Sequence, residues 1–256
     1  MRIKARSTMP VTTIALLPAL LLAAVGCSSA DSPASGKVPD PKGSAAAPAP
    51  GAPGASASGS AAPGAAAPVG LERAALVQGD LPGYQISAQG KNPNAPDGQP
   101  QADKKACQPL ADIMGDKPDP AARETVNRGI GSQKQVGLAV SASVSSYSES
   151  DAKRLVSRLR DAVAACGTGF AATVEKQTGS YRDVKTVPYR TAGDESVSWT
   201  TIAAAGGVSA QVHLVVVREG DTVVRLMALN VAGAGQQATV PQEVADKQLE
   251  KVAKAG

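Results

Sequence analysis

The fold is decided by the stretch from Val136 to Cys166, which reads VGLAVSASVSSYSESDAKRLVSRLRDAVAAC. Its first part alternates between apolar side chains and small or hydroxyl-bearing ones. The apolar positions are Val136, Leu138, Val140, Ala142 and Val144. This period of two predicts a β-strand over 136–146, with one apolar face and one face of small polar groups.

The second part of the stretch predicts an amphipathic helix. Ser148 can cap its first turn, and Asp151 follows three residues later. The apolar positions that share one helical face are Leu155, Leu159, Ala162, Val163 and Cys166. Because Cys166 ends this core-facing stripe, its position favours a structural bridge over a reactive thiol.

The flanking sequence adds further elements of both kinds. We expect a short helix over 71–78 that Gly79 stops, a polar mobile loop over 91–104, and a helical turn near 107–114. Strands are expected at 173–175, 181–189 and 196–204, and a last helix begins near Thr239 with Pro241 in its first turn. The sequence therefore predicts an α+β fold, in which helices flank a twisted, mainly antiparallel sheet.

A β-hairpin is predicted where 208–218 meets 222–231 around Gly220-Asp221. With those two residues as the loop, Val217 faces Val224 and His213 faces Ala228. Both faces of the hairpin are apolar, which is expected of central strands that are covered on both sides.

Residues 1–26 have the pattern of an export signal. A basic start with Arg2, Lys4 and Arg6 precedes about 15 uncharged, mostly apolar residues, too few for a typical membrane-spanning helix. The stretch ends in Ala24-Val25-Gly26-Cys27, which resembles the lipobox of bacterial lipoproteins. We predict that residues 1–26 are removed and that Cys27 carries diacylglycerol and palmitate, which anchor the chain to the extracytoplasmic face of the cell membrane. The alternatives are an ordinary signal peptide with a chance cysteine, and an uncleaved anchor.

Between the anchor and the folded part, residues 27–70 are almost entirely alanine, proline, glycine and serine. Such a segment cannot bury enough apolar area to offset its loss of conformational entropy, so we expect a disordered tether. Residues 71–256 are then long enough for a single extracytoplasmic domain.

Composition excludes nucleic acid as a partner. Removal of the signal lowers the formal net charge from +4 to +1, because it removes three basic residues and no acidic ones. The whole chain has only one Trp, four Tyr and one Phe. Basic patches with aromatic stacking platforms are therefore not expected. The predicted partners are the lipid bilayer and an envelope ligand or protein of unknown identity.

With Cys27 committed to lipid, Cys107 and Cys166 remain as a pair in an exported chain, which favours a disulfide between them. Two free buried thiols are the alternative. Two distant cysteines and one histidine do not make a tetrahedral metal site, and no cofactor is predicted.

Short motifs lie at several turns and beside both cysteines. They are Leu71 with Ala75-Leu76, Asp80-Leu81-Pro82-Gly83-Tyr84, Pro109-Leu110 after Cys107, Ala164-Ala165 before Cys166, and Gly193-Asp194-Glu195. Together they resemble small exported actinobacterial domains of a PsbP-like type, found in lipoproteins of unknown function and as the extracytoplasmic sensor domain of certain serine/threonine kinases. The resemblance implies an antiparallel sheet with flanking helices, a structural disulfide and a cleft. Such kinase domains usually carry a second disulfide, for which this chain has no cysteines, so details of the cleft do not carry over.

No catalytic apparatus is predicted from the residues. His213 is the only histidine, and no G-x-S-x-G elbow accompanies it. Ser150-Asp151-Ala152-Lys153 matches S-x-x-K, but the same residues suit the start of a capped helix. Asp116 and Asp119 lack the alternating oxygen ligands of a calcium loop and are interpreted as solvated charges.

Three functions fit these observations. The first is a non-enzymatic binding or sensing module of the cell envelope, for which Ser209, Gln211 and His213 on one hairpin face are the predicted ligand contacts. The second is an envelope-polymer hydrolase or transferase, which requires convergent acids from among Glu175, Asp183, Asp194 and Glu195. The third is a structural scaffold for other envelope proteins.

Overall fold

The computed structural model describes residues 70–90, 98–230 and 237–256. The predicted signal, Cys27 with its predicted lipid, the predicted tether up to residue 69 and residues 91–97 of the predicted loop lie outside the described residues. Within them, no helix is both long enough and apolar enough to cross a membrane.

The described residues form an α+β fold, as the sequence predicts. The helical elements are α1 (Leu71–Ala74), the 3-10 turn η1 (Lys105–Cys107), α2 (Gln108–Met114), α3 (Glu149–Ala165) and α4 (Gln242–Ala255). The strands are β1 (Tyr84–Gln89), β2 (Gln101–Ala102), β3 (Glu124–Ser132), β4 (Leu138–Ser146), β5 (Phe170–Val174), β6 (Gln177–Thr186), β7 (Glu195–Ala205), β8 (Val208–Glu219) and β9 (Thr222–Asn230).

All nine strands belong to one antiparallel sheet, in the order β1-β3-β4-β9-β8-β7-β6-β5-β2. The predicted hairpin register is confirmed, because Val217 pairs with Val224 and His213 pairs with Ala228. The hairpin β8–β9 lies at the centre of the sheet, which explains why both of its faces are apolar.

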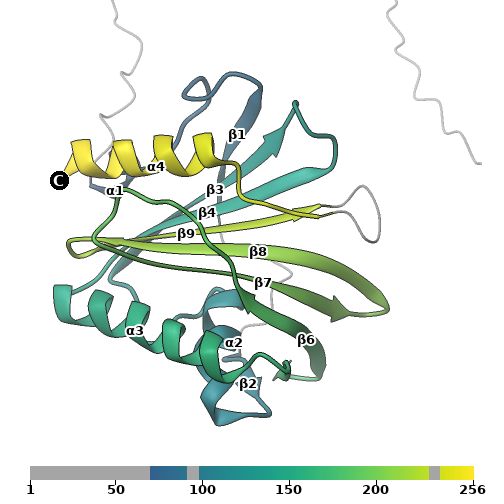
Figure 1. Ribbon diagram of the computed structural model, residues 1–256. Helices are drawn as coiled ribbons and strands as arrows, with labels where there is room; N and C mark the ends of the chain where they lie inside the picture. The colour runs from purple at the N-terminus through teal and green to yellow at the C-terminus, as the bar shows by residue number, and fades with distance from the viewer. Residues whose placement is uncertain (1–69, 91–97, 231–236) are drawn as a thin grey trace, which may run out of the picture. The chain divides into compact units, whose positions relative to one another are not determined.

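Helices cover both faces of the sheet, and each face has its own hydrophobic core (Figure 1). On the first face, α1 and α4 pack over Val140, Val215 and Leu226, among others. On the second face, α2 and α3 pack over Trp199, Leu214 and others. Alternation along each central strand therefore divides its side chains between two separate cores.

Hydrogen bonds join α1 to α4 on the first face. The Gln248 side chain is fully buried, and its Nε2 donates to the Ala74 carbonyl while its Oε1 accepts from the Leu76 amide. Arg128 on β3 donates through Nε to the Leu76 carbonyl at 2.7 Å. The start of the described domain is thus attached to its C-terminal helix.

The capped helix after β4 is confirmed. Ser148 has an extended backbone, and its Oγ accepts from the Asp151 amide at 3.1 Å. Asp151 and Glu149 place negative charge in the first turn, where the helix dipole favours it.

Several predicted boundaries are wrong in detail. β4 begins at Leu138 because Gly137 takes a positive φ in the preceding turn, which leaves Val136 83% exposed. α1 ends at Ala74 instead of near Gln78. β5 and β6 begin at Phe170 and Gln177, earlier than expected, and Glu175 lies in the turn between them with φ 53°.

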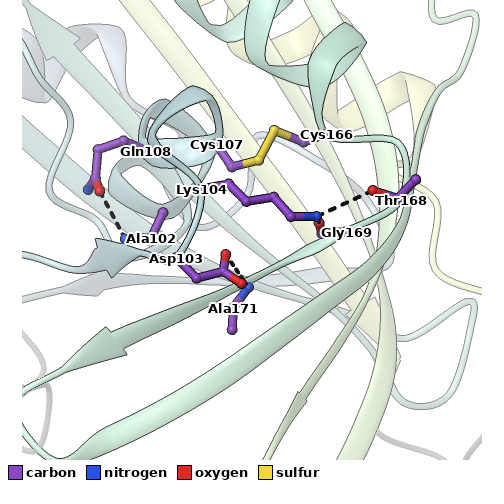
Figure 2. The surroundings of a disulfide bond; sticks show 9 residues. All are labelled: Ala102, Asp103, Lys104, Cys107, Gln108, Cys166, Thr168, Gly169 and Ala171. Carbon is purple, nitrogen blue, oxygen red and sulfur yellow. Dashed lines mark hydrogen bonds between the residues drawn. A yellow bond between two sulfur atoms is a disulfide. The ribbon is translucent and has the colours of Figure 1, made fainter.

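The predicted disulfide is confirmed between Cys107 and Cys166, and Figure 2 shows its surroundings. Beside it, the Lys104 Nζ donates to the Gly169 carbonyl at 2.5 Å, and the Ala171 amide donates to Asp103. These contacts join η1 and the start of α2 to the end of α3 and to β5. The bond therefore holds α2 against the second face of the sheet.

Candidate ligand-binding cavity

A cavity of about 820 Å³ opens on the second face of the sheet, beside the area that α3 covers. Its floor is formed by β3, β4 and β9, and its opposite wall by the C-terminal end of α2 and the segment that follows to Ala122. Ligand sites commonly have volumes of about 300–1,000 Å³, so the space is large enough for a small molecule.

Hydroxyl groups cover the floor of the cavity. They come from the polar face of β4 and from its neighbour β3, in Thr125, Ser141, Ser143 and Ser145, and the Asn127 amide lies among them. Thr125 and Ser145 are bonded through their hydroxyl oxygens at 2.8 Å, and Ser143 donates to the Asn127 Oδ1 at 2.6 Å. Ser141 Oγ is buried with no hydrogen-bond partner. Because β4 alternates strictly, these groups lie opposite its apolar core face.

Arg225 on β9 is the charged residue of the floor. Its side chain is only 8% exposed, and its guanidinium donates to the Ile113 carbonyl and to Ser143 Oγ, both at 2.8 Å. Nη2 also lies 3.0 Å from an Asp116 carboxylate oxygen. Burial lowers the pKa of Arg225, and the negative charge of Asp116 partly opposes this effect. The remaining Nε–H is buried without a partner.

Apolar side chains form the walls around this polar floor. They come from α2, the segment after it, β5 and β9, and include Ile113, Met114, Pro118, Ala122, Val174 and Met227. A mostly apolar lining with a few placed polar groups is typical of small-molecule sites. The cavity can therefore take a ligand that is apolar over most of its length and polar at one end.

A buried carboxylate on α2 fixes the position of this helix, which forms one wall of the cavity. Asp112 is 2% exposed, and its Oδ1 accepts from Gln99 Nε2 at 2.6 Å and from Gln108 Nε2 at 2.7 Å. Burial raises the pKa of Asp112, while the two amide donors oppose this rise. The pair of glutamines ties the chain before β2 to α2, which positions the rim of the cavity.

The three hairpin residues predicted as ligand contacts lie on the first face, away from the cavity. Ser209 is exposed, whereas Gln211 Oε1 accepts from the Ala238 amide at 3.3 Å. His213 is 2% exposed, and its Nδ1 accepts from the Val240 amide at 2.9 Å. Gln211 and His213 thus fasten the segment before α4 onto the sheet. Ligand binding at these three residues stays a prediction.

The tautomer of His213 bears on nucleophilic chemistry. Nδ1 accepts a backbone hydrogen bond, so the ring proton lies on Nε2, which is 2.9 Å from Ser198 Oγ. In this tautomer the imidazole donates to the serine. A general base would have to accept the serine proton instead. Both side chains are also buried, so the pair has the properties of a structural contact.

The four acids of the hydrolase hypothesis do not converge. Asp194 and Glu195 both pair with Arg218 where β7 begins, at 2.8 and 3.0 Å. Glu175 lies at the β5–β6 turn, beyond the other end of the eleven-residue β7, which is roughly 30 Å away at the usual rise per residue. Asp183 lies at an irregularity in β6 and is 3.9 Å from the Lys185 Nζ.

The S-x-x-K match and the two aspartates considered as calcium ligands, Asp116 and Asp119, form hydrogen bonds or ion pairs within the fold. Lys153 pairs with Glu149 at 2.6 Å, and Ser150 is bonded to the capping Ser148, so the S-x-x-K match belongs to a helix start. Asp119 pairs with Arg158 at 2.7 Å. Asp116 is an exposed loop charge, as predicted, but it also pairs with the buried Arg225, which the sequence did not indicate.

The sequence predicts only part of the cavity. It predicts the small polar face of β4, but it does not indicate that this face lines a binding site. Arg225 stands alone as a cation between Val224 and Leu226 in a buried strand, and a buried cation requires partners. That pattern could have indicated the site. Asp116 could not, because nothing in the sequence pairs it with β9.

No protein-family model matches the sequence, and no curated protein matches it. Among solved structures, the chain is similar to the extracellular domain of PknH from Mycobacterium tuberculosis. The TM-score is 0.46 at 13% identity, over 74% of this chain and 97% of that one. It is also similar to an uncharacterised protein from Mycobacterium smegmatis described as the Rv0999 ortholog. There the TM-score is 0.37 at 12% identity, over 72% of this chain and 92% of that one.

Proposed function

We propose that this protein is a non-enzymatic binding or sensing module of the cell envelope, which holds a small molecule in the cavity between β3, β4, β9 and α2. The observation that carries the proposal is the combination of a polar floor, apolar walls and a volume of about 820 Å³. Such a space beside a buried, incompletely bonded guanidinium is difficult to explain by packing alone, because protein interiors are otherwise filled closely.

The chemistry of the lining supports binding over catalysis. Thr125 and Ser145 are hydrogen-bonded to each other, and Ser143 donates to Asn127 and accepts from the cationic Arg225, so none of these bonds is to a general base that would activate a hydroxyl. Tyr147 also lines the cavity, and burial raises its pKa to about 12, which keeps the phenol neutral at physiological pH. Neutral hydroxyls and one cation can orient a ligand without transferring protons.

The binding proposal can be tested with 1-anilinonaphthalene-8-sulfonate, a dye that fluoresces in apolar sites. The mature chain with Cys27→Ser is expected to bind one dye molecule saturably. Ala122→Trp places a large ring at the cavity wall and is expected to weaken binding at least tenfold. Ala164→Trp, on the exposed side of α3, is the matched control and should leave the dye affinity unchanged. Equal affinities in all three chains would contradict a binding role for the cavity.

Membrane attachment is the second part of the proposal, and it rests on the lipobox at 24–27. The chain is expected to carry acyl groups on Cys27 when it is expressed in an actinobacterial host. Cys27→Ser should move it from the membrane fraction into the medium or the soluble envelope fraction, because the anchor is lost. Mass spectrometry of the native N-terminal peptide checks the modification. An unmodified Cys27 would contradict the proposed membrane attachment, but it would not affect the proposed ligand binding in the cavity.

A further inference from the structure

The polar floor of the cavity carries a cation. Among the described residues that line the cavity, the charged ones are Arg225, Lys117 and Asp116. Lys117 has an interaction of its own, so the charges that bear on a ligand are those of Arg225 and its partner Asp116. A buried cation beside an apolar cavity favours a ligand group of opposite charge.

The two side chains of the ion pair between Arg225 and Asp116 differ in their exposure to solvent. The arginine side chain is 8% exposed, whereas the aspartate side chain is 57% exposed. Desolvating a guanidinium is costly unless anions compensate it, and a carboxylate that stays largely in water compensates it poorly. The contact is also single, between Nη2 and one carboxylate oxygen at 3.0 Å, although guanidinium and carboxylate groups can pair through two hydrogen bonds.

Asp116 also has an unusual backbone. Its φ is 60°, in the left-handed region that few residues other than glycine, asparagine and aspartate adopt. This conformation turns the chain directly after α2, at a residue whose carboxylate is largely exposed and 3.0 Å from the guanidinium. The Asp116 carboxylate therefore contacts both water and Arg225.

Resting on the proposed function above, we propose that the cavity binds an amphiphile with an anionic headgroup, and that Asp116 is a counter-ion that the headgroup displaces from Arg225. Either a carboxylate or a phosphate would serve as the anionic headgroup. The headgroup would lie against Arg225 and the hydroxyl of Ser143, and the apolar part would extend along Met114, Val174 and Met227.

The competing explanation is that Arg225 serves the fold alone. It does bond the Ile113 carbonyl and so joins α2 to β9. A purely structural arginine would be expected to have all its buried donors satisfied, but the Nε–H has no partner, and neither does the neighbouring Ser141 hydroxyl. Both atoms are buried below the floor surface, so a headgroup would reach the guanidinium through Nη2, where the exposed Asp116 now pairs with it.

The test is a displacement series with the bound dye described above. Four probes share an eight-carbon chain: octanoate, octyl phosphate, octanol and octyltrimethylammonium. Octanoate or octyl phosphate should displace the dye at least tenfold more effectively than octanol, and octyltrimethylammonium should be weakest. The two anionic probes distinguish a carboxylate headgroup from a phosphate one.

Asp116→Asn supplies the sharper measurement, because asparagine keeps the left-handed backbone and removes only the charge. Affinity for the preferred anionic probe should rise about tenfold, as expected when a competing like charge is removed. Asp183→Asn is the matched control, since Asp183 has φ 53°, an equally exposed side chain and an ion pair outside the cavity. It should change no probe affinity. Arg225→Met should abolish the preference for anions, and circular dichroism establishes whether that variant is folded.

The outcomes separate the two proposals. If the dye binds nowhere in the cavity, the binding function itself fails. If the dye binds but octanol and octyltrimethylammonium displace it as well as the anions do, the cavity binds without regard to charge and the anionic class is wrong. If Asp116→Asn changes anion affinity no more than Asp183→Asn does, Asp116 is not a displaced counter-ion.

Discussion

Replacing Cys107 and Cys166 together with serine is expected to lower the free energy of unfolding by about 4 kcal/mol. The bond joins residues 59 apart in sequence, and the entropy of closing a loop of that length in the unfolded chain gives this magnitude. Both sulfurs lie in the core of the second face, so the loss of their packing acts in the same direction. For a domain of this size the expected fall in Tm is about 10 °C.

The measurement is urea unfolding of residues 27–256, followed by the fluorescence of Trp199. This is the only tryptophan of the protein, and it is fully buried against the second face. Both chains carry Cys27→Ser, so that they differ only in the disulfide. The double variant should also bind the dye more weakly, because α2 forms the cavity wall. A loss of less than about 1 kcal/mol would mean that the unfolded chain is restricted without the bond.

Lowering the pH from 7 to 4 is expected to destabilise the domain by roughly 3 kcal/mol through His213 alone. Burial lowers the pKa of His213 from 6.5 to about 4. The unfolded chain therefore binds a proton below pH 6.5 that the folded chain does not bind until about pH 4. Stability from the neutral imidazole is complete above pH 6.5 and is lost as the pH falls toward 4, at about 1.4 kcal/mol per pH unit.

His213→Gln separates this effect from the titration of carboxylates. Glutamine offers an acceptor for the Val240 amide and a donor for Ser198, but it carries no charge between pH 7 and 4. The variant should be less stable at pH 7 because its shape differs. Its unfolding free energy should then fall less steeply with decreasing pH, and the two curves should converge. Parallel curves would show that His213 titrates normally.

Local patterns predicted the centre of the fold. β4 and α3 followed from a change of hydrophobic period between Ser146 and Ser148, where a capping hydroxyl marks the boundary. The register of β8 and β9 followed from a two-residue loop, because the loop length alone determines which residues pair. The disulfide followed from cysteine count and compartment. Each of these inferences needed only neighbouring residues or a simple count.

The edge of the sheet did not follow from such patterns. β3 carries Arg128 between its apolar positions Val126 and Ile130 and two glycines on its other face, which obscures the period of two. Arg128 is buried there because the distant Leu76 carbonyl and Glu72 carboxylate bond its guanidinium. The cavity was not predicted either, because it too depends on contacts between residues that are distant in sequence. Its floor and its rim come from β9 and from the end of α2, and only the three-dimensional fold places Arg225 beside Asp116.

The attachment of α1 to α4 through Gln248 determines where mechanical load enters the molecule. Any chain preceding Gly70 joins the domain at α1, and force along it would be carried into α4 and β3 through the bonds of Gln248 and Arg128. The cavity lies on the opposite face, behind a sheet whose strands share continuous hydrogen bonding. Pulling on the chain before Gly70 would thus load α4 and β3, and β3 also contributes Thr125 and Asn127 to the cavity floor on the other face.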